Sequence, residues 1–117
     1  MQKVKVQVKS ENYITKVHNL VCKIPRGKVT TYGALAREIK IQNSKVKIDA
    51  RMVGWALHQN KDPKVPCYRV VNREGKVASA FSFGGPMEQK RRLEAEGIVF
   101  KSDLEVDLEK CFVDFVG

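Results

Sequence analysis

The sequence predicts a single, mainly helical domain with short β segments. Four stretches have the apolar spacing or the terminal residues of short helices, and the segments between them are extended or rich in turn residues. A chain of 117 residues suits one modest hydrophobic core. The sequence shows no internal repeat, low-complexity stretch or sign of a second domain, so we expect residues 1–117 to form one unit.

The chain begins with a basic segment followed by an amphipathic helix. Valines and lysines alternate over residues 3–9, which is typical of a short edge strand or of a basic tail. Ser10 is a suitable N-cap for a helix from about Glu11 to Ile24. Pro25-Arg26-Gly27 should end this helix. Its apolar residues share one face: Ile14, Val17, Leu20, Val21 and Ile24.

Two more short helices follow, each with its own N-cap. The extended connector 28–31 leads to Thr31, which can cap a helix from Tyr32 to about Ile39. After a polar, basic loop, Asp49 can cap a helix from Ala50 to about Gln59. Two consecutive short helices are typical of a helix-turn-helix-like pair, although this connection exceeds the usual three or four residues.

The Ala50–Gln59 helix has features of an element that meets a partner closely. Arg51 lies in its first turn, where the N-terminal residues of a recognition helix contact DNA. Gly54 lies in its interior, at a cost of about 1 kcal/mol relative to alanine. A helix tolerates that cost where something approaches its backbone. Close packing against another helix explains the glycine equally well.

The C-terminal third combines a loop, one further helix and an extended tail. Residues 78–85 contain small residues, two phenylalanines and a glycine pair, and we expect an ordered loop that borders a pocket. Pro86 suits the first turn of a helix from Met87 to Glu96, which a glycine follows. Its basic run at residues 90–92 is typical of a solvated face. Loosely alternating apolar residues from Ile98 to Val116 predict a terminal hairpin.

Composition favours a polyanionic partner. Lys and Arg total 22 against 13 Asp and Glu, a net charge of +9, which suggests nucleic acid first and an anionic membrane second. No stretch has the apolar length of a membrane span or of a signal peptide. The three cysteines are far apart and lack CxxC spacing, which disfavours a disulfide framework and a zinc site. We expect no metal or organic cofactor, and a cytoplasmic, nucleoid or nuclear location.

The segment 65–71, VPCYRVV, places a cysteine at a stiff corner. Pro66 fixes its own φ, so Cys67 should lie at a turn rather than inside a helix, and Val70-Val71 should begin a buried strand. A thiol in this position, with Arg69 two residues on, is suited to be a positioned nucleophile. A small, buried, apolar side chain is nevertheless the more common role of a free cysteine.

Four motifs in this order resemble those of the O6-alkylguanine-DNA alkyltransferases and of the related alkyltransferase-like proteins. The similarity covers about residues 13–100 and leaves 98–117 as a terminal extension. It implies a winged helix-turn-helix-like DNA-binding domain, without the separate N-terminal domain of the longer alkyltransferases. The motifs are Ile24–Gly33 (IPRGKVTTYG), Ala50–Gly54 (ARMVG), Pro66–Val71 (PCYRVV), and the Gly84-Gly85 pair followed by Leu93–Gly97 (LEAEG).

The resemblance also implies roles for individual residues. Cys67 matches the alkyl-accepting thiolate, and Glu96 matches the glutamate of the relay that activates it. Arg51 matches the arginine finger that fills the gap left by the extruded nucleotide, and Tyr32 the tyrosine that helps rotate its phosphate. The recognition helix lies in the minor groove in this family, which suits small residues. Further DNA-contacting positions are Thr31, Gly54, Arg69 and Asn60, the last near the family's hinge asparagine, and the lesion-pocket positions are Pro66, Val70, Ser82 and Phe83.

The main departure from the family pattern is Tyr68, which stands where the relay has a histidine. The alkyl group on guanine O6 is reached only after the nucleotide is flipped, and its acceptor must be a thiolate. A phenol, with a pKa of about 10, is a poor base near neutrality. Either the site lacks its base, or it is rewired, with the Tyr68 hydroxyl bonded to Glu96 and the thiolate stabilised by Arg69 or by the helix field. In addition, Phe81-Ser82-Phe83 replaces an Asn-Tyr-Ser-like triplet, so Ser82 would reach a flipped guanine less far than tyrosine.

Three functions remain compatible with the sequence. The first, and our main interpretation, is a single-turnover methylated-DNA–protein-cysteine methyltransferase that flips O6-alkylguanine and takes the alkyl group irreversibly on Cys67. The cysteine itself favours this function, since the resemblance implies that alkyltransferase-like proteins lack it. The second is an alkyltransferase-like damage sensor that binds the lesion without repair and recruits other repair proteins, which the run 89–97 (QKRRLEAEG) favours. The third is a basic nucleic-acid-binding domain without lesion preference. The partner expected for the first two is double-stranded DNA with alkylated guanine, and no membrane.

Overall fold

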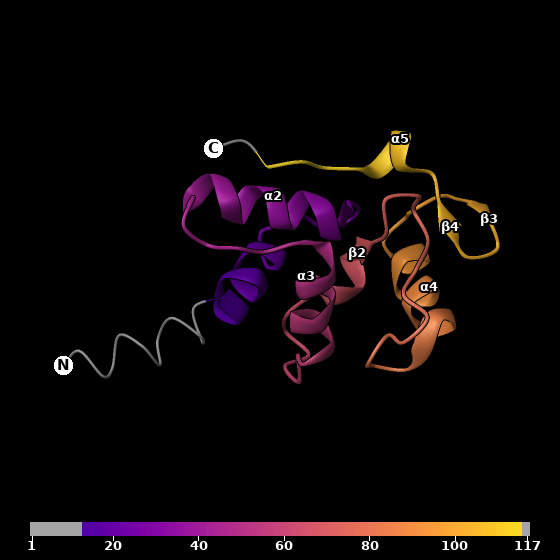
Figure 1. Cartoon of the computed structure of the whole chain (residues 1–117). Coiled ribbons are helices and arrows are strands. Elements are labelled where there is room, and N and C mark those ends of the chain that lie inside the picture. The colour runs from indigo at the N-terminus through magenta and orange to yellow at the C-terminus, as the bar shows by residue number, and fades with distance from the viewer. Residues whose placement is uncertain (1–12, 116–117) are drawn as a thin grey trace.

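The computed structural model describes residues 13–115, which form a mainly helical body with two small sheets (Figure 1). The first described segment is helical over 13–21. The expected N-terminal strand and the Ser10 cap lie outside the described residues. In chain order the further elements are β1 (Thr30–Thr31), α2 (Tyr32–Gln42), α3 (Ala50–His58), a 3₁₀ turn (Cys67–Arg69), β2 (Val70–Val71), α4 (Gly85–Ala95), β3 (Phe100–Ser102), β4 (Glu105–Val106) and α5 (Leu108–Cys111).

Helices α2 and α3 begin at the two predicted caps. The Thr31 side chain accepts a hydrogen bond from the amide of Ala34 at 3.1 Å, and Asp49 accepts one from the amide of Met52 at 2.9 Å. Helix α2 extends three residues beyond its predicted end at Ile39. No helix-breaking residue precedes Asn43, so the exposed polar end of the helix continues to that residue.

The parallel pairing of β1 with β2 positions the central turn. Thr30 pairs with Val70 and Thr31 with Val71, which joins segments forty residues apart in the sequence. Tyr32 begins α2 directly after β1, and Cys67 begins the 3₁₀ turn that leads directly into β2. Figure 1 shows β2 between α3 and α4, at the centre of the molecule.

Two hydrophobic clusters meet at β2. Val70 belongs to the cluster formed with the first helix, α2 and α3, and Val71 belongs to the cluster formed with α4 and the C-terminal segment. Successive strand residues point to opposite faces, so this two-residue strand connects both clusters. The fully buried Gln89 of α4 adds a polar link, since its amide donates to the carbonyls of Tyr68 at 3.1 Å and Val70 at 3.0 Å and accepts from the amide of Ala78 at 2.8 Å.

Two further local predictions differ from the structure. The first helix ends before Ile24, because residues 22–24 form a turn in which Ile24 bonds back to Val21. Cys67 lies inside one 3₁₀ turn, since Pro66 accepts a hydrogen bond from the Arg69 amide and starts a helical turn instead of a plain corner.

The C-terminal prediction was correct only in its first half. The hairpin forms between β3 and β4, but the next four residues form helix α5, which Asp107 caps by accepting from the amide of Glu109. The chain then runs back over α2, as Figure 1 shows, where Val113 bonds to Val29 at 2.8 Å and Asp114 pairs with Arg37.

Candidate functional site

A cavity of about 690 Å³ opens between α3 and the loop that precedes α4. Helix α3 lines the cavity with residues of one face, and the loop lines it mainly with small residues. Tyr32 from the start of α2 and Cys67 from the 3₁₀ turn also line the cavity. The full lining consists of Tyr32, Arg51, Gly54, Trp55, Leu57, His58, Cys67, Asn72, Lys76, Val77, Ala78, Ser79, Ala80, Phe81 and Ser82.

The thiol of Cys67 is enclosed and has one weak side-chain partner. The residue is 6% exposed, and the Nδ2 of Asn60 lies 3.7 Å from its Sγ. Asn60 is itself buried and held by Asp62, whose carbonyl accepts from Nδ2 and whose amide donates to Oδ1, both at 3.0 Å. Burial raises the pKa of the Cys67 thiol, and the opposing effects of Asn60, a backbone hydrogen bond and the charge of Arg92 are smaller. At neutral pH this thiol is therefore protonated.

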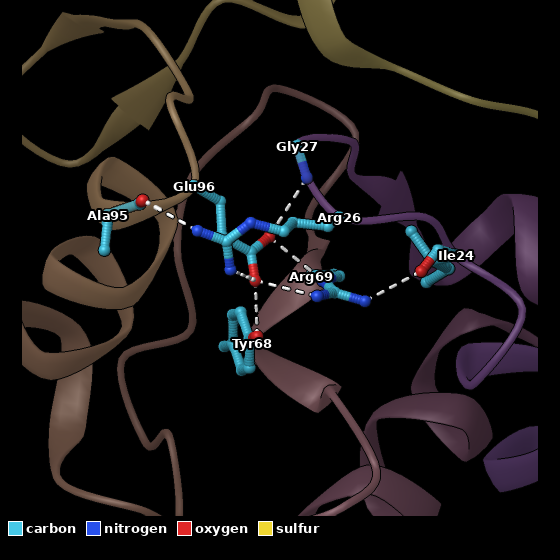
Figure 2. A network of polar contacts seen from close by, with 7 residues as sticks. All are labelled: Ile24, Arg26, Gly27, Tyr68, Arg69, Ala95 and Glu96. Atoms are coloured by element: carbon cyan, nitrogen blue, oxygen red, sulfur yellow. Dashed lines mark hydrogen bonds and ion pairs between the residues drawn. The ribbon is translucent and has the colours of Figure 1, made fainter.

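Glu96 is the centre of a buried polar network that joins three segments (Figure 2). Its Oε2 accepts from the Tyr68 hydroxyl at 2.5 Å and from Arg69 Nη2 at 2.8 Å. Its Oε1 accepts from Arg69 Nε at 3.0 Å and from the amide of Gly27 at 3.1 Å. Although burial opposes ionisation, these donors keep the pKa of Glu96 below its ordinary value. Glu96 is thus a charged, fully bonded carboxylate.

The Arg69 side chain faces this network instead of the surface. Besides the bidentate pair with Glu96, its Nη1 donates to the carbonyl of Ile24 at 2.8 Å. These three hydrogen bonds engage Nε and both Nη atoms of the guanidinium, and a contact of Arg69 with DNA stays a prediction. The cation whose charge lowers the pKa of the Cys67 thiol is Arg92.

Tyr68 donates a hydrogen bond to Glu96, as expected for the rewired site described in the sequence analysis. Burial, followed by the hydrogen bond with Glu96, raises the pKa of the phenol above 10. A phenol that donates its proton to a carboxylate does not remove a proton from a thiol near pH 7. The part of the chain that the structure describes therefore places no general base on Cys67.

Arg92 lies among three aromatic rings, which sequence reasoning did not find. Its guanidinium carbon lies 5.8 Å from the ring centroid of Tyr68, 5.4 Å from that of Phe81 and 5.7 Å from that of Phe83. Its Nε also donates to Glu88 at 2.8 Å. The basic run at 90–92 was interpreted as a solvated face, and only the tertiary position of the phenylalanines distinguishes Arg92 from its neighbours.

The cavity brings together five of the residues singled out in the sequence and leaves others aside. Tyr32, Arg51, Gly54, Cys67 and Ser82 line it. Pro66 and Val70 are buried without lining it, Phe83 packs on Phe81 with ring centroids 5.9 Å apart, and Thr31 caps α2. Trp55 and His58 line the cavity but were not predicted, because their helix was analysed only for its small residues and its arginine.

The fold and this site define a member of the alkyltransferase class. Residues 12–98 match the family described as 6-O-methylguanine DNA methyltransferase, DNA binding domain, and the chain belongs to this family. The family includes methylated-DNA–protein-cysteine methyltransferases.

Particular relatives share most of the chain. Alkyltransferase-like protein 1 of Schizosaccharomyces pombe is 38% identical over 92 residues, which cover 78% of this chain and 81% of that protein. The DNA base-flipping protein of Vibrio parahaemolyticus is 32% identical over 102 residues, covering 86% and 94%. The crystal structure of S. pombe Atl1 in complex with damaged DNA containing O6-carboxymethylguanine matches with a TM-score of 0.68 at 36% identity, covering 86% and 94%.

Two further observations bear on the site. Within residues 13–115, no helix combines the length and the apolar character needed to cross a membrane. Among the same residues, no three His, Cys, Asp or Glu side chains are grouped so that they could hold a metal ion.

Proposed function

We propose that this protein binds duplex DNA containing O6-alkylguanine, flips the damaged nucleotide into the cavity beside Cys67 and holds it there. The hydrogen bond from Tyr68 to Glu96 is the observation that favours holding the damaged nucleotide over removing its alkyl group. That bond occupies the phenol and leaves Cys67 a buried, protonated thiol.

Charge and shape support DNA as the ligand. The chain carries a net charge of +9, which favours a polyanion. Arg51 is exposed in the first turn of α3 and lines the cavity, the place that the family resemblance gives to the arginine finger. The solved structure of S. pombe Atl1 holds damaged DNA, and the Vibrio relative is named for base flipping.

The cavity suits an extruded nucleotide more than a base inside a duplex. Its wall combines apolar surface, small side chains from Ala78 to Ala80, and the phenol of Tyr32. A flipped base is recognised in such pockets by stacking and by hydrogen bonds to its edge. The short side chain of Ser82 leaves more space than a tyrosine would.

Alkyl transfer to Cys67 is the second candidate, because the thiol lines this cavity and Asn60 points at its sulfur. In that reaction Sγ would bond to the alkyl carbon as the carbon–O6 bond breaks. The electron pair would remain on guanine, which would regain a ring proton, and the thiol would lose its proton. The reaction needs the thiolate, and a free cysteine already has only a few per cent of it at neutral pH. Burial of Cys67 lowers that fraction further.

Two measurements test the proposal. Fluorescence anisotropy compares the affinity for matched duplexes with guanine or O6-methylguanine at one position, and we expect tighter binding of the lesion. Intact mass after prolonged incubation with excess lesion duplex should show unmodified protein. A single methyl addition on the peptide containing Cys67, absent from Cys22 and Cys111, would establish the second candidate instead. Equal affinity for both duplexes would contradict lesion recognition.

A further inference from the structure

Helix α3 presents an indole to the same cavity as its arginine. Arg51, Gly54, Trp55 and His58 all line the cavity, and they follow the i, i+3, i+4, i+7 spacing of one helical face. The opposite face of the helix, with Val53 and Ala56, is buried in the core. The cavity-facing side of α3 is thus available to a ligand.

Trp55 is an unusual residue for an open surface. The residue is 59% exposed, and it is the one tryptophan of the 117-residue chain. An indole offers about 150–250 Å² of rigid, mainly apolar contact area, and the fold leaves more than half of this residue exposed. Trp55 lies directly beside Gly54, where a partner can approach the helix backbone. Because the protein also has a net charge of +9, nucleic acid is the occupant that matches this surface.

We propose that Trp55 is a second DNA-stacking residue, which packs its indole on the nucleotide adjoining the extruded one while Arg51 occupies the vacated position. This inference rests on the proposed function. Arg51 and Trp55 are one helical turn apart, about 5.4 Å along the axis, compared with a rise of about 3.4 Å per nucleotide. A helix lying along the groove therefore places Trp55 between one and two base steps from the finger, within reach of the nucleotide next to the extruded one. Bases stack on aromatic side chains whatever their identity, so this contact adds affinity without sequence preference.

The single tryptophan makes the contact directly observable. Binding of the O6-methylguanine duplex should quench the Trp55 fluorescence and protect it from acrylamide. Trp55→Ala should weaken binding of that duplex at least about fivefold, the lower end of the effect of removing one stacked base. Trp55→Phe should retain part of the affinity. Because no cation is removed, the salt dependence of binding should stay unchanged in Trp55→Ala.

Met87→Ala is the matched control, since Met87 is equally exposed at 60% but lies on α4. We expect it to bind like wild type. If labelled-duplex anisotropy shows lesion preference while Trp55 is not quenched and Trp55→Ala binds normally, the stacking role is overturned and the proposed function stands. If both duplexes bind equally, the proposed function fails, and stacking beside an extruded nucleotide is overturned with it; quenching with loss in Trp55→Ala would then make Trp55 a contact to undamaged DNA. If no duplex binds, both are overturned.

Discussion

Replacing Tyr68 with histidine should convert this site toward alkyl transfer. Imidazole has two ring nitrogens, so one can donate to Glu96 as the Tyr68 hydroxyl does at 2.5 Å while the other remains available as a base. Glu96 is held independently by Arg69 and Gly27, so its carboxylate stays in place when the phenol is removed. The substitution therefore tests the missing base with little change around it.

The expected gain follows from the state of the thiol. A cysteine of ordinary pKa is a few per cent ionised at neutral pH, and burial keeps Cys67 below that fraction. A positioned general base typically contributes about 10²–10⁴-fold, and we expect at least a tenfold faster transfer, since Asn60 and the cavity are already in place. Any residual transfer by the wild type should still be rising at pH 9, because burial raises the pKa of the thiol.

Single-turnover transfer from an O6-methylguanine duplex, measured from pH 6 to 9, provides the assay. Tyr68→Phe is the control that removes the Glu96 hydrogen bond without adding a base, and it should transfer no faster than wild type. Cys67→Ser should abolish any transfer. A wild-type midpoint well below the pKa of free cysteine, together with no gain from histidine, would show that Tyr68 already serves the thiol and that the reasoning is wrong.

Four further outcomes follow from the charges and contacts of the site. If about four to six phosphates are neutralised, log K should fall against log salt with a slope of roughly −4 to −5, and a flat titration would exclude a backbone-dominated interface. Arg51→Ala should weaken binding of the lesion duplex more than binding of the undamaged duplex, because an arginine finger acts only when the nucleotide is flipped. Equal losses on both duplexes, with the slope of log K against log salt reduced by about one, would make Arg51 a phosphate contact. Arg92→Met should slow the alkylation of Cys67 by iodoacetamide near pH 8, because the charge of Arg92 lowers the pKa of the thiol, and Arg92→Lys should preserve the rate. Finally, although burial opposes ionisation, hydrogen bonding lowers the pKa of Glu96 in the folded protein. The ionised carboxylate therefore contributes fully to stability above its ordinary pKa of 4.5, and this contribution is lost as the pH falls through the lowered folded pKa. Urea midpoints measured from pH 2 to 7 should show this loss in the wild type and not in Glu96→Gln.

Local chemistry explains which parts of the fold were predictable. The caps Thr31 and Asp49 act on amides three residues away, and both helices begin where the sequence indicated. Helix α5 was missed because the alternation of Leu104, Val106 and Leu108 outweighed the single cap at Asp107. A pattern of period two cannot signal a four-residue helix, which has room for one turn only.

The candidate site was predictable only where a motif carried it. The resemblance led to Cys67, Arg51 and Tyr32, and the structure places all three on one cavity. The contacts of Arg69 and Arg92 could not be read from sequence, because both guanidinium groups can reach several partners and only tertiary packing selects among them. Long, flexible cations are the side chains whose roles depend most on their surroundings.

Glu96 deserves a different interpretation from the one that its motif suggests. Its four donors come from Gly27, Tyr68 and Arg69, so the carboxylate joins the connector before β1, the 3₁₀ turn and the end of α4. Removing it would leave the partly buried Arg69 without its counter-ion, which is costly whether or not the protein transfers alkyl groups. A structural role therefore explains the presence of Glu96 without an active relay. The residue between Cys67 and Arg69 is the informative one: a phenol there adds a structural hydrogen bond, whereas an imidazole would keep a second nitrogen to act on the thiol.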